Sequence, residues 1–172
     1  MGVRRVVTGV NEHGRSCVVA DGATPGHASN IRADFDEMWI LDALPPDPAD
    51  PRDPVANLGA VRLKPPLGGI AWRVVTYPPG MGDPDRPPPA LTNVEGGGAY
   101  EHGDPRWHTT HSIDFAIVIS GELVLGLDEE EVHLRAGDCV VQRGTRHAWF
   151  NRGSEPCVVS FVLISAGAPD GA

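Results

Sequence analysis

Three side chains of metal-binding type lie in two short segments of the chain. His108 and Asp114 stand six residues apart in W-H-T-T-H-S-I-D-F, and His147 follows in R-H-A-W-F-N. Positions separated by an even number lie on one face of a strand, so His108 and Asp114 share a face. Two imidazoles and a carboxylate with open coordination positions suit non-haem Fe(II), and can also hold Mn(II), Zn(II), Ni(II) or Co(II). If the two segments are neighbours, the sequence predicts a divalent metal site at these three residues.

The spacing resembles the two sequence motifs of the cupin superfamily, whose members are small β-barrels. The first motif is H-x-H, three or four residues, Glu, six residues and Gly. The second is Gly, five residues, Pro-x-Gly, two residues, His, three residues and Asn. The positions of the first motif are occupied by His108, Thr110, Asp114 and Gly121, and those of the second by Gly137, Arg143-Gly144, His147 and Asn151, with the Pro-x-Gly one residue shorter.

The resemblance implies an all-β fold, a cupin-type double-stranded β-helix or jelly-roll barrel with an N-terminal β arm. The chain departs from the family pattern at two ligand positions: Thr110 replaces the usual second histidine, and Asp114 replaces the usual glutamate. His111 takes the place of the missing histidine if the segment is irregular, and otherwise faces away from the site. A barrel without metal, whose histidines hydrogen-bond within a polar pocket, is the alternative.

Further side chains are candidates for catalysis or for shaping a pocket. His111 is a candidate to move a proton, and Arg143 to pair with a substrate carboxylate or enolate, although a turn arginine is often simply solvated. Trp149 has the parity of His147 and forms either a flat wall for an aromatic or polyene substrate or part of the core. The predicted pocket residues are Thr110, Phe115, Gln142 and Trp149.

Short apolar runs separated by turn residues must position these side chains. Residues 113–127 alternate apolar runs with glycines, which is typical of consecutive antiparallel strands. Further strands are predicted at 3–7, 17–20, 37–41, 61–63, 70–77 and 157–164, with proline-rich loops at 45–54 and 78–98. The second loop either covers the barrel mouth or lies on the surface. We expect one domain, with residues 1–58 as the N-terminal arm and loops and 59–166 as the barrel.

The strand predicted at residues 112–120 is apolar on both faces. One face carries Ile113, Phe115, Ile117 and Ile119, and the other Asp114, Ala116, Val118 and Ser120. If one face lines a cavity, the other must pack under the N-terminal arm, a second sheet or a second subunit. A homodimer is the simplest expectation, and an arm folded back on its own barrel is the alternative.

The acidic composition argues against two classes of binding partner and leaves a small molecule as the expected one. The net charge of -9 over 172 residues argues against nucleic acid and against an anionic membrane surface. Cys17, Cys139 and Cys157 are odd in number and far apart, which favours free thiols in a reducing compartment. Because no signal-peptide pattern opens the chain, a cytoplasmic location is expected.

Two functional classes remain. The first is a metal-dependent cupin enzyme that uses Fe, Mn, Zn or Ni on a carbonyl- or enol-bearing small molecule, as a dioxygenase, decarboxylase, isomerase or cyclase, in a setting such as secondary metabolism. The second is a non-catalytic cupin that binds or senses a small apolar ligand, which Thr110 favours. Metal-free acid–base catalysis by His108 and Asp114 ranks last.

Overall fold

The computed structural model describes residues 2–29, 33–81, 94–95 and 106–167, and every regular element among them is a β-strand. The strands are β1 (Arg4–Val10), β2 (Ser16–Ala23), β3 (Gly26–Ser29), β4 (Asp34–Leu41), β5 (Val61–Arg62), β6 (Ile70–Tyr77), β7 (Val94–Glu95), β8 (Ser112–Ser120), β9 (Glu122–Gly126), β10 (Glu131–Arg135), β11 (Cys139–Arg143), β12 (Ala148–Phe150) and β13 (Cys157–Ser165). In these ranges no helix is long and apolar enough to cross a membrane.

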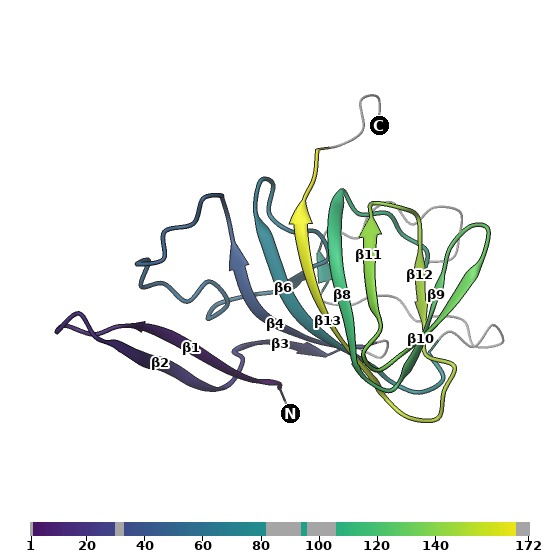
Figure 1. Ribbon diagram of the computed structural model, residues 1–172, viewed down its shortest axis with the longest axis horizontal. Helices are drawn as coiled ribbons and strands as arrows, with labels where there is room; N and C mark the ends of the chain where they lie inside the picture. The colour runs from purple at the N-terminus through teal and green to yellow at the C-terminus, as the bar shows by residue number, and fades with distance from the viewer. Residues whose placement is uncertain (1, 30–32, 82–93, 96–105, 168–172) are drawn as a thin grey trace.

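Two antiparallel sheets form the barrel (Figure 1). The larger has six strands in the order β11-β8-β13-β6-β4-β3, and the smaller has three in the order β10-β9-β12. Crossovers between strands far apart in sequence, such as β13 between β6 and β8, give the jelly-roll arrangement. The β1–β2 hairpin forms a separate sheet and projects away from the barrel. The expected all-β jelly-roll fold is confirmed.

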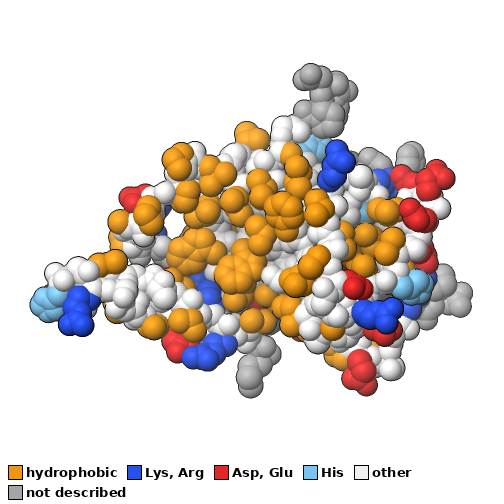
Figure 2. Space-filling view, in the orientation of Figure 1, with side chains coloured by type: hydrophobic (Ala, Val, Ile, Leu, Met, Phe, Trp, Pro, Cys, Tyr) orange, Lys and Arg blue, Asp and Glu red, His pale blue; other side chains and the backbone are white. Residues whose placement is uncertain are grey.

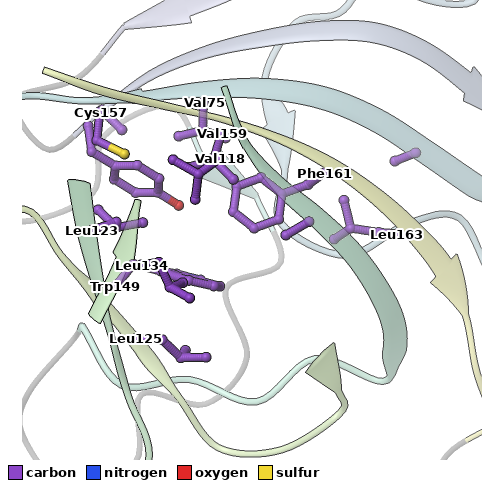
Figure 3. Close-up of a cluster of buried hydrophobic side chains, with 14 residues drawn as sticks. Val75, Val118, Leu123, Leu125, Leu134, Trp149, Cys157, Val159, Phe161 and Leu163 are labelled. Carbon is purple, nitrogen blue, oxygen red and sulfur yellow. The ribbon is translucent and has the colours of Figure 1, made fainter. Parts of the chain in front are cut away.

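The core lies between the two sheets because the strands alternate buried and exposed residues. In β8, Ala116 and Val118 are buried while their sequence neighbours are exposed, and β13 shows the same period of two. Figure 3 shows how side chains from both sheets meet in one cluster. Its labelled members are Val75, Val118, Leu123, Leu125, Leu134, Trp149, Cys157, Val159, Phe161 and Leu163.

Two predictions about the N-terminal part need correction, and a third, about a later loop, falls mostly outside the described residues. The barrel begins well before residue 59, because β3 and β4 belong to the six-stranded sheet; only the β1–β2 hairpin forms an arm. The predicted strand at 37–41 missed the charged first half of β4, which begins at Asp34. Most of the proline-rich segment 78–98, including the part expected to cover the barrel mouth, lies outside the described ranges.

Candidate functional site

His108 and His147 form the centre of the candidate site. The segments before β8 and β12 pair as an antiparallel bridge, in which each histidine donates its backbone N–H to the carbonyl of the other at 3.0 Å. The two imidazole rings consequently lie side by side in a tilted arrangement, with centroids 4.3 Å apart and planes inclined by 54°. Residues 39 positions apart in the sequence are thus adjacent inside the barrel.

Each imidazole ring is oriented by a hydrogen bond to the backbone carbonyl two residues before it. Nδ1 of His108 lies 3.0 Å from the carbonyl oxygen of Arg106, and Nδ1 of His147 lies 2.9 Å from that of Thr145. A carbonyl oxygen can only accept, so in both neutral rings Nδ1 carries the proton. The unprotonated nitrogen of each ring is therefore Nε2, whose lone pair is available to a ligand.

Burial keeps both imidazoles neutral. Desolvation lowers the pKa of His108, and desolvation together with the neighbouring His108 lowers the pKa of His147 to about 3. Neutral imidazole is the form that binds a metal ion, and no proton has to be displaced from it near pH 7. Two neutral, backbone-anchored imidazoles side by side are a fitting donor pair for a divalent ion.

A cavity of about 130 Å³ opens in front of the histidine pair. Its polar lining consists of His108, His147, Thr110, Asp114, Arg73 and Arg106. Its apolar lining consists of Ala33, Phe35, Leu63, Val75, Tyr77, Met81, Trp149, Phe161 and Leu163. Trp149 stands edge-on to His147 at 5.7 Å and to Phe161 at 5.5 Å, so the aromatic wall is continuous with the imidazoles. A mostly apolar cavity with a few convergent polar groups is typical of a small-molecule site.

Asp114 brings an unsatisfied carboxyl group to this cavity. It points inward from β8 and is only 5% exposed, and its Oδ1 atom has no hydrogen-bond partner. Desolvation raises its pKa, an effect that the Ser112 hydroxyl and the charge of Arg73 partly offset. Buried polar atoms are usually paired, so an unpaired oxygen facing a cavity indicates room for a ligand or an ion.

The three predicted metal ligands line one cavity but do not close into a single cluster. Among the described residues, no group of three His, Cys, Asp or Glu side chains is close enough to hold an ion. The two histidines fit a metal ion as a pair, whereas Asp114 sits apart from them in the wall that also contains Arg73. The predicted three-residue facial set is not assembled in this arrangement.

Arg73 is a site residue that the sequence analysis missed. It is 4% exposed in β6, directly opposite Glu37 of β4, and its Nη2 atom lies 3.1 Å from Glu37 Oε1 and donates to the carbonyl of Arg62 at 2.6 Å. Its Nε atom has no partner. One feature of the sequence could have revealed it. Arg73 lies in the apolar run I-A-W-R-V-V-T-Y, and strand alternation puts its side chain on the same, inward face as Val75 and Tyr77.

Of the remaining predicted site residues, some line the cavity and the others do not. Thr110 and Trp149 line the cavity, and Thr110 accepts a hydrogen bond from Ser112 at 2.9 Å. Gln142 is buried but donates to the Thr145 hydroxyl and does not line the cavity.

Like Gln142, three further predicted residues lie outside the cavity. Phe115 is 48% exposed on the outer face of β8, because its parity is opposite to that of Asp114. Arg143 is exposed at the end of β11, and half-buried His111 precedes β8. The arrangement therefore gives no support to catalytic roles for His111 and Arg143.

Comparison with known proteins agrees with this fold. Residues 91–164 match the Cupin domain family model. The chain is 32% identical to Oryzines biosynthesis cluster protein J of Aspergillus oryzae over 72% of its own length and 59% of that protein. It is 27% identical to the cupin-domain-containing oxidoreductase srdD of Neurospora crassa over 95% of this chain and 76% of that one.

A solved structure covers nearly the whole chain. The cupin domain of Schizosaccharomyces pombe Cnp3 superposes with a TM-score of 0.50 at 11% identity, over 94% of this chain and 87% of that domain. Such a likeness concerns the fold alone, and the chain spans less than two thirds of the Aspergillus oryzae relative. With the paired motifs, the jelly-roll topology and the family match together, this chain belongs to the cupin superfamily.

Proposed function

We propose that this protein is a metal-dependent cupin enzyme that acts on a carbonyl- or enol-bearing small molecule in a biosynthetic pathway. The observation that carries the proposal is the pair of neutral imidazoles, each fixed by a backbone carbonyl so that Nε2 faces a largely apolar cavity. The relatives support it, since one is named a biosynthesis cluster protein and another a cupin-domain-containing oxidoreductase.

His108 and His147 would hold the ion through Nε2, while Asp114 lines the same cavity apart from the pair and is not counted among its ligands. A divalent ion there would supply Lewis-acid polarisation of a carbonyl oxygen, or reactivity toward O₂ if it is redox-active. His147 is buried and His108 half-buried, and the hydrogen bond from each Nδ1 to a backbone carbonyl limits rotation of the ring, which preserves the orientation of the pair.

The rest of the cavity would bind and orient the substrate. Trp149 and Phe161 offer flat apolar surface to an aromatic or conjugated body. Arg73 is a buried cation in the same cavity, and its unpaired Nε–H would donate to an anionic oxygen such as a carboxylate or enolate. This role takes the place of the one predicted for Arg143.

The test is metal binding by matched histidine variants. Protein purified without chelator is loaded with Fe(II), Mn(II), Zn(II) or Ni(II), desalted and analysed for its metal content. We expect about one ion per chain in the wild type, and at least tenfold weaker binding in His108→Ala and His147→Ala. His133→Ala, which removes an exposed histidine of β10, is the control and should bind as the wild type does.

A wild type that retains no stoichiometric ion would contradict the proposal, as would histidine variants that bind metal normally. The first of these results would favour the second candidate, a non-catalytic cupin that binds a small apolar ligand. That candidate is favoured by Thr110 in place of a histidine and by the lack of a three-residue ligand cluster in the described residues.

A further inference from the structure

Two side chains that line the cavity each carry a buried polar atom with no hydrogen-bond partner among the described residues. The atoms are Nε of Arg73 in β6 and Oδ1 of Asp114 in β8. Such atoms are rare, because an unmade hydrogen bond leaves the cost of desolvation uncompensated. The two atoms are opposite in kind, since the Nε–H group can only donate and an oxygen of an ionised carboxylate can only accept.

These charged side chains point inward at places where their outward-facing neighbours are apolar. Trp72 is 41% exposed and Phe115 48%, whereas Arg73 is 4% and Asp114 5% exposed. Figure 2 shows hydrophobic side chains gathered over the strands of this sheet, with charged groups toward the margins of the view. Packing alone favours the opposite arrangement, in which apolar residues are buried and charged residues face water. The inversion points to a role for Arg73 and Asp114 in binding.

The two side chains stand on either side of β13. Phe161 is the Cα partner of Arg73, and Leu163 is that of Asp114. The Cα atoms of Arg73 and Asp114 are therefore separated by two strand spacings, roughly 10 Å, and by two residues along the strands. Phe161 and Leu163, labelled in Figure 3, line the cavity between them as an apolar floor. Among the described residues, the ion pair of Arg73 is made with Glu37 and leaves Asp114 to face the cavity separately.

The charges around the cavity balance before a substrate enters. Arg73 and Arg106 in the lining are two cations, and Asp114 in the lining and Glu37 behind Arg73 are two carboxylates. A substrate carboxylate would add an uncompensated negative charge to a largely apolar cavity, which is costly. A neutral carbonyl compound preserves the balance, and its oxygen can accept a hydrogen bond from Arg73.

The volume of the cavity limits the size of the ligand. The described residues enclose about 130 Å³. An engineered cavity of roughly 150 Å³ in another protein binds one benzene molecule. Trp149 and Phe161 meet edge to face at 5.5 Å in the wall, so an inserted ring would contact aromatic surface. The enclosed space therefore suits a single ring.

We propose that Arg73 and Asp114 are the specificity-determining pair of this cavity, and that its substrate is a neutral hydroxy-carbonyl compound of single-ring size. Arg73 Nε–H donates to the carbonyl oxygen, Asp114 Oδ1 accepts from the hydroxyl, and the ring lies over Phe161 and Leu163. Burial raises the pKa of Asp114, and a hydroxyl that donates to its carboxylate would offset that effect. The inference rests on the proposed function, because it names a substrate class for the same cavity, and it narrows the partner of Arg73 to a carbonyl oxygen that can become an enolate.

The test is isothermal titration calorimetry with 4-hydroxyacetophenone and two analogues that each lack one polar group. Acetophenone lacks the hydroxyl, and 4-ethylphenol lacks the carbonyl. The wild type should bind 4-hydroxyacetophenone at least about tenfold more tightly than either analogue, because each analogue leaves one buried protein group unpaired. Binding should also be at least about tenfold weaker for 6-hydroxy-2-acetonaphthone, which has two fused rings, and for 4-hydroxybenzoate, which carries a charge.

Matched variants assign each preference to one side chain. Asp114→Ala should lose the preference over acetophenone and keep that over 4-ethylphenol. Glu37→Leu/Arg73→Met should do the reverse, and it removes the buried ion pair as a whole, so that no single charge is left behind. Glu122→Ala and Arg135→Met replace exposed residues of the smaller sheet and should keep both preferences. Because the readout is a ratio of two affinities, a general loss of folded protein does not imitate it.

Circular dichroism checks that each variant is folded, and Asp114→Ala should fold because the oxygen it removes has no partner among the described residues. A wild type that does not bind 4-hydroxyacetophenone, or does not distinguish it from acetophenone, would overturn the proposal. Folded site variants that keep both preferences would overturn it as well, as would tighter binding of the two-ring or the charged probe.

Metal analysis of the same preparations separates this inference from the proposed function. Asp114→Ala should retain the metal content of the wild type, while His108→Ala should lose the ion and keep the preference for the hydroxyl. A wild type that binds metal but does not distinguish the probes would overturn this inference alone. A wild type that distinguishes the probes but retains no ion would contradict only the proposed metal site.

Discussion

His147 owes its chemistry to burial, which keeps its imidazole neutral. The unfolded chain takes up a proton at His147 below a pKa of 6.5, whereas the folded chain does so only near a pKa of 3. The unfolded state therefore binds more protons between these values, and the free energy of unfolding falls as the pH drops from 6.5 toward 3. The raised pKa values of Asp114 and Glu37 act in the opposite direction, so the contribution of His147 requires a variant comparison.

We expect metal-free wild type to lose on the order of 1–2 kcal/mol more stability between pH 7 and pH 5 than His147→Gln does. Urea denaturation at both pH values, after removal of metal, measures this difference. His133→Gln replaces an exposed histidine and should keep the pH dependence of the wild type. An identical pH dependence in His147→Gln and in the wild type would show that His147 titrates normally.

Arg73 and Glu37 form a buried ion pair between β4 and β6, 4% and 1% exposed. Removing one partner leaves the other charge uncompensated, so Arg73→Met should lower the free energy of unfolding by about 3–5 kcal/mol. The double variant Glu37→Leu/Arg73→Met should recover most of that loss. Arg4→Met breaks an exposed ion pair with Asp21 and should change stability by less than about 1 kcal/mol.

Chemical denaturation of these four proteins checks the prediction. A double variant no more stable than Arg73→Met would mean that the pair is not the source of the loss. Because the double variant is expected to fold, it also separates the structural role of Arg73 from its proposed role toward an anionic substrate.

The sequence predicted the residues of the site better than their contacts. Even spacing placed Asp114 on the inner face, and the two motifs brought His108 to His147. Arg73 was missed because its partner Glu37 lies 36 residues away on another strand, a pairing that local pattern does not reveal. Phe115 was assigned to the pocket although its parity puts it on the opposite face from Asp114, as the structure shows.

At the scale of elements, glycine turns fix how the strands meet. Gly121 joins β8 to β9 with φ of +78°, and an added Cβ would lie 2.5 Å from the carbonyl oxygen of Pro156 and 2.8 Å from Cys157 Cα. Gly137, before β11, has φ of +93° with nothing within 4 Å of a Cβ. Both alanine variants carry left-handed strain of about 1–2 kcal/mol, but only Gly121→Ala adds a backbone clash.

Gly121→Ala should therefore be less stable than Gly137→Ala by at least about 1 kcal/mol in urea denaturation. Equal losses would mean that the turn after β8 relaxes without disturbing the β13 segment that begins at Cys157.

Strand alternation explains why most elements could be predicted from sequence and why one part could not. The apolar runs that became β1, β6, β8 and β13 were all recognised. The start of β4, D-F-D-E, was not, because its charges are satisfied by distant partners: Asp36 by His27 and Glu37 by Arg73. Residues 1–58 were consequently assigned to an arm, although the sheet already begins at β3.

At the scale of the whole molecule, the six-stranded sheet separates the cavity from an exposed apolar surface. Its inner face carries Arg73, Asp114 and the cavity wall, and its outer face carries exposed apolar side chains such as Phe115 and Val141. Both arise from the same alternation in β6, β8 and β13, since each residue that faces the cavity has outward-facing neighbours.

The most direct measurement is the position of the metal in crystals of the protein soaked with one equivalent of Mn(II), Fe(II), Ni(II) or Zn(II), located by anomalous scattering at the absorption edge. The account predicts a single strong peak within bonding distance of Nε2 of both His108 and His147, about 2.0–2.1 Å for zinc. No peak in the cavity, or a peak bound by exposed histidines such as His133 while the cavity remains empty, would contradict it.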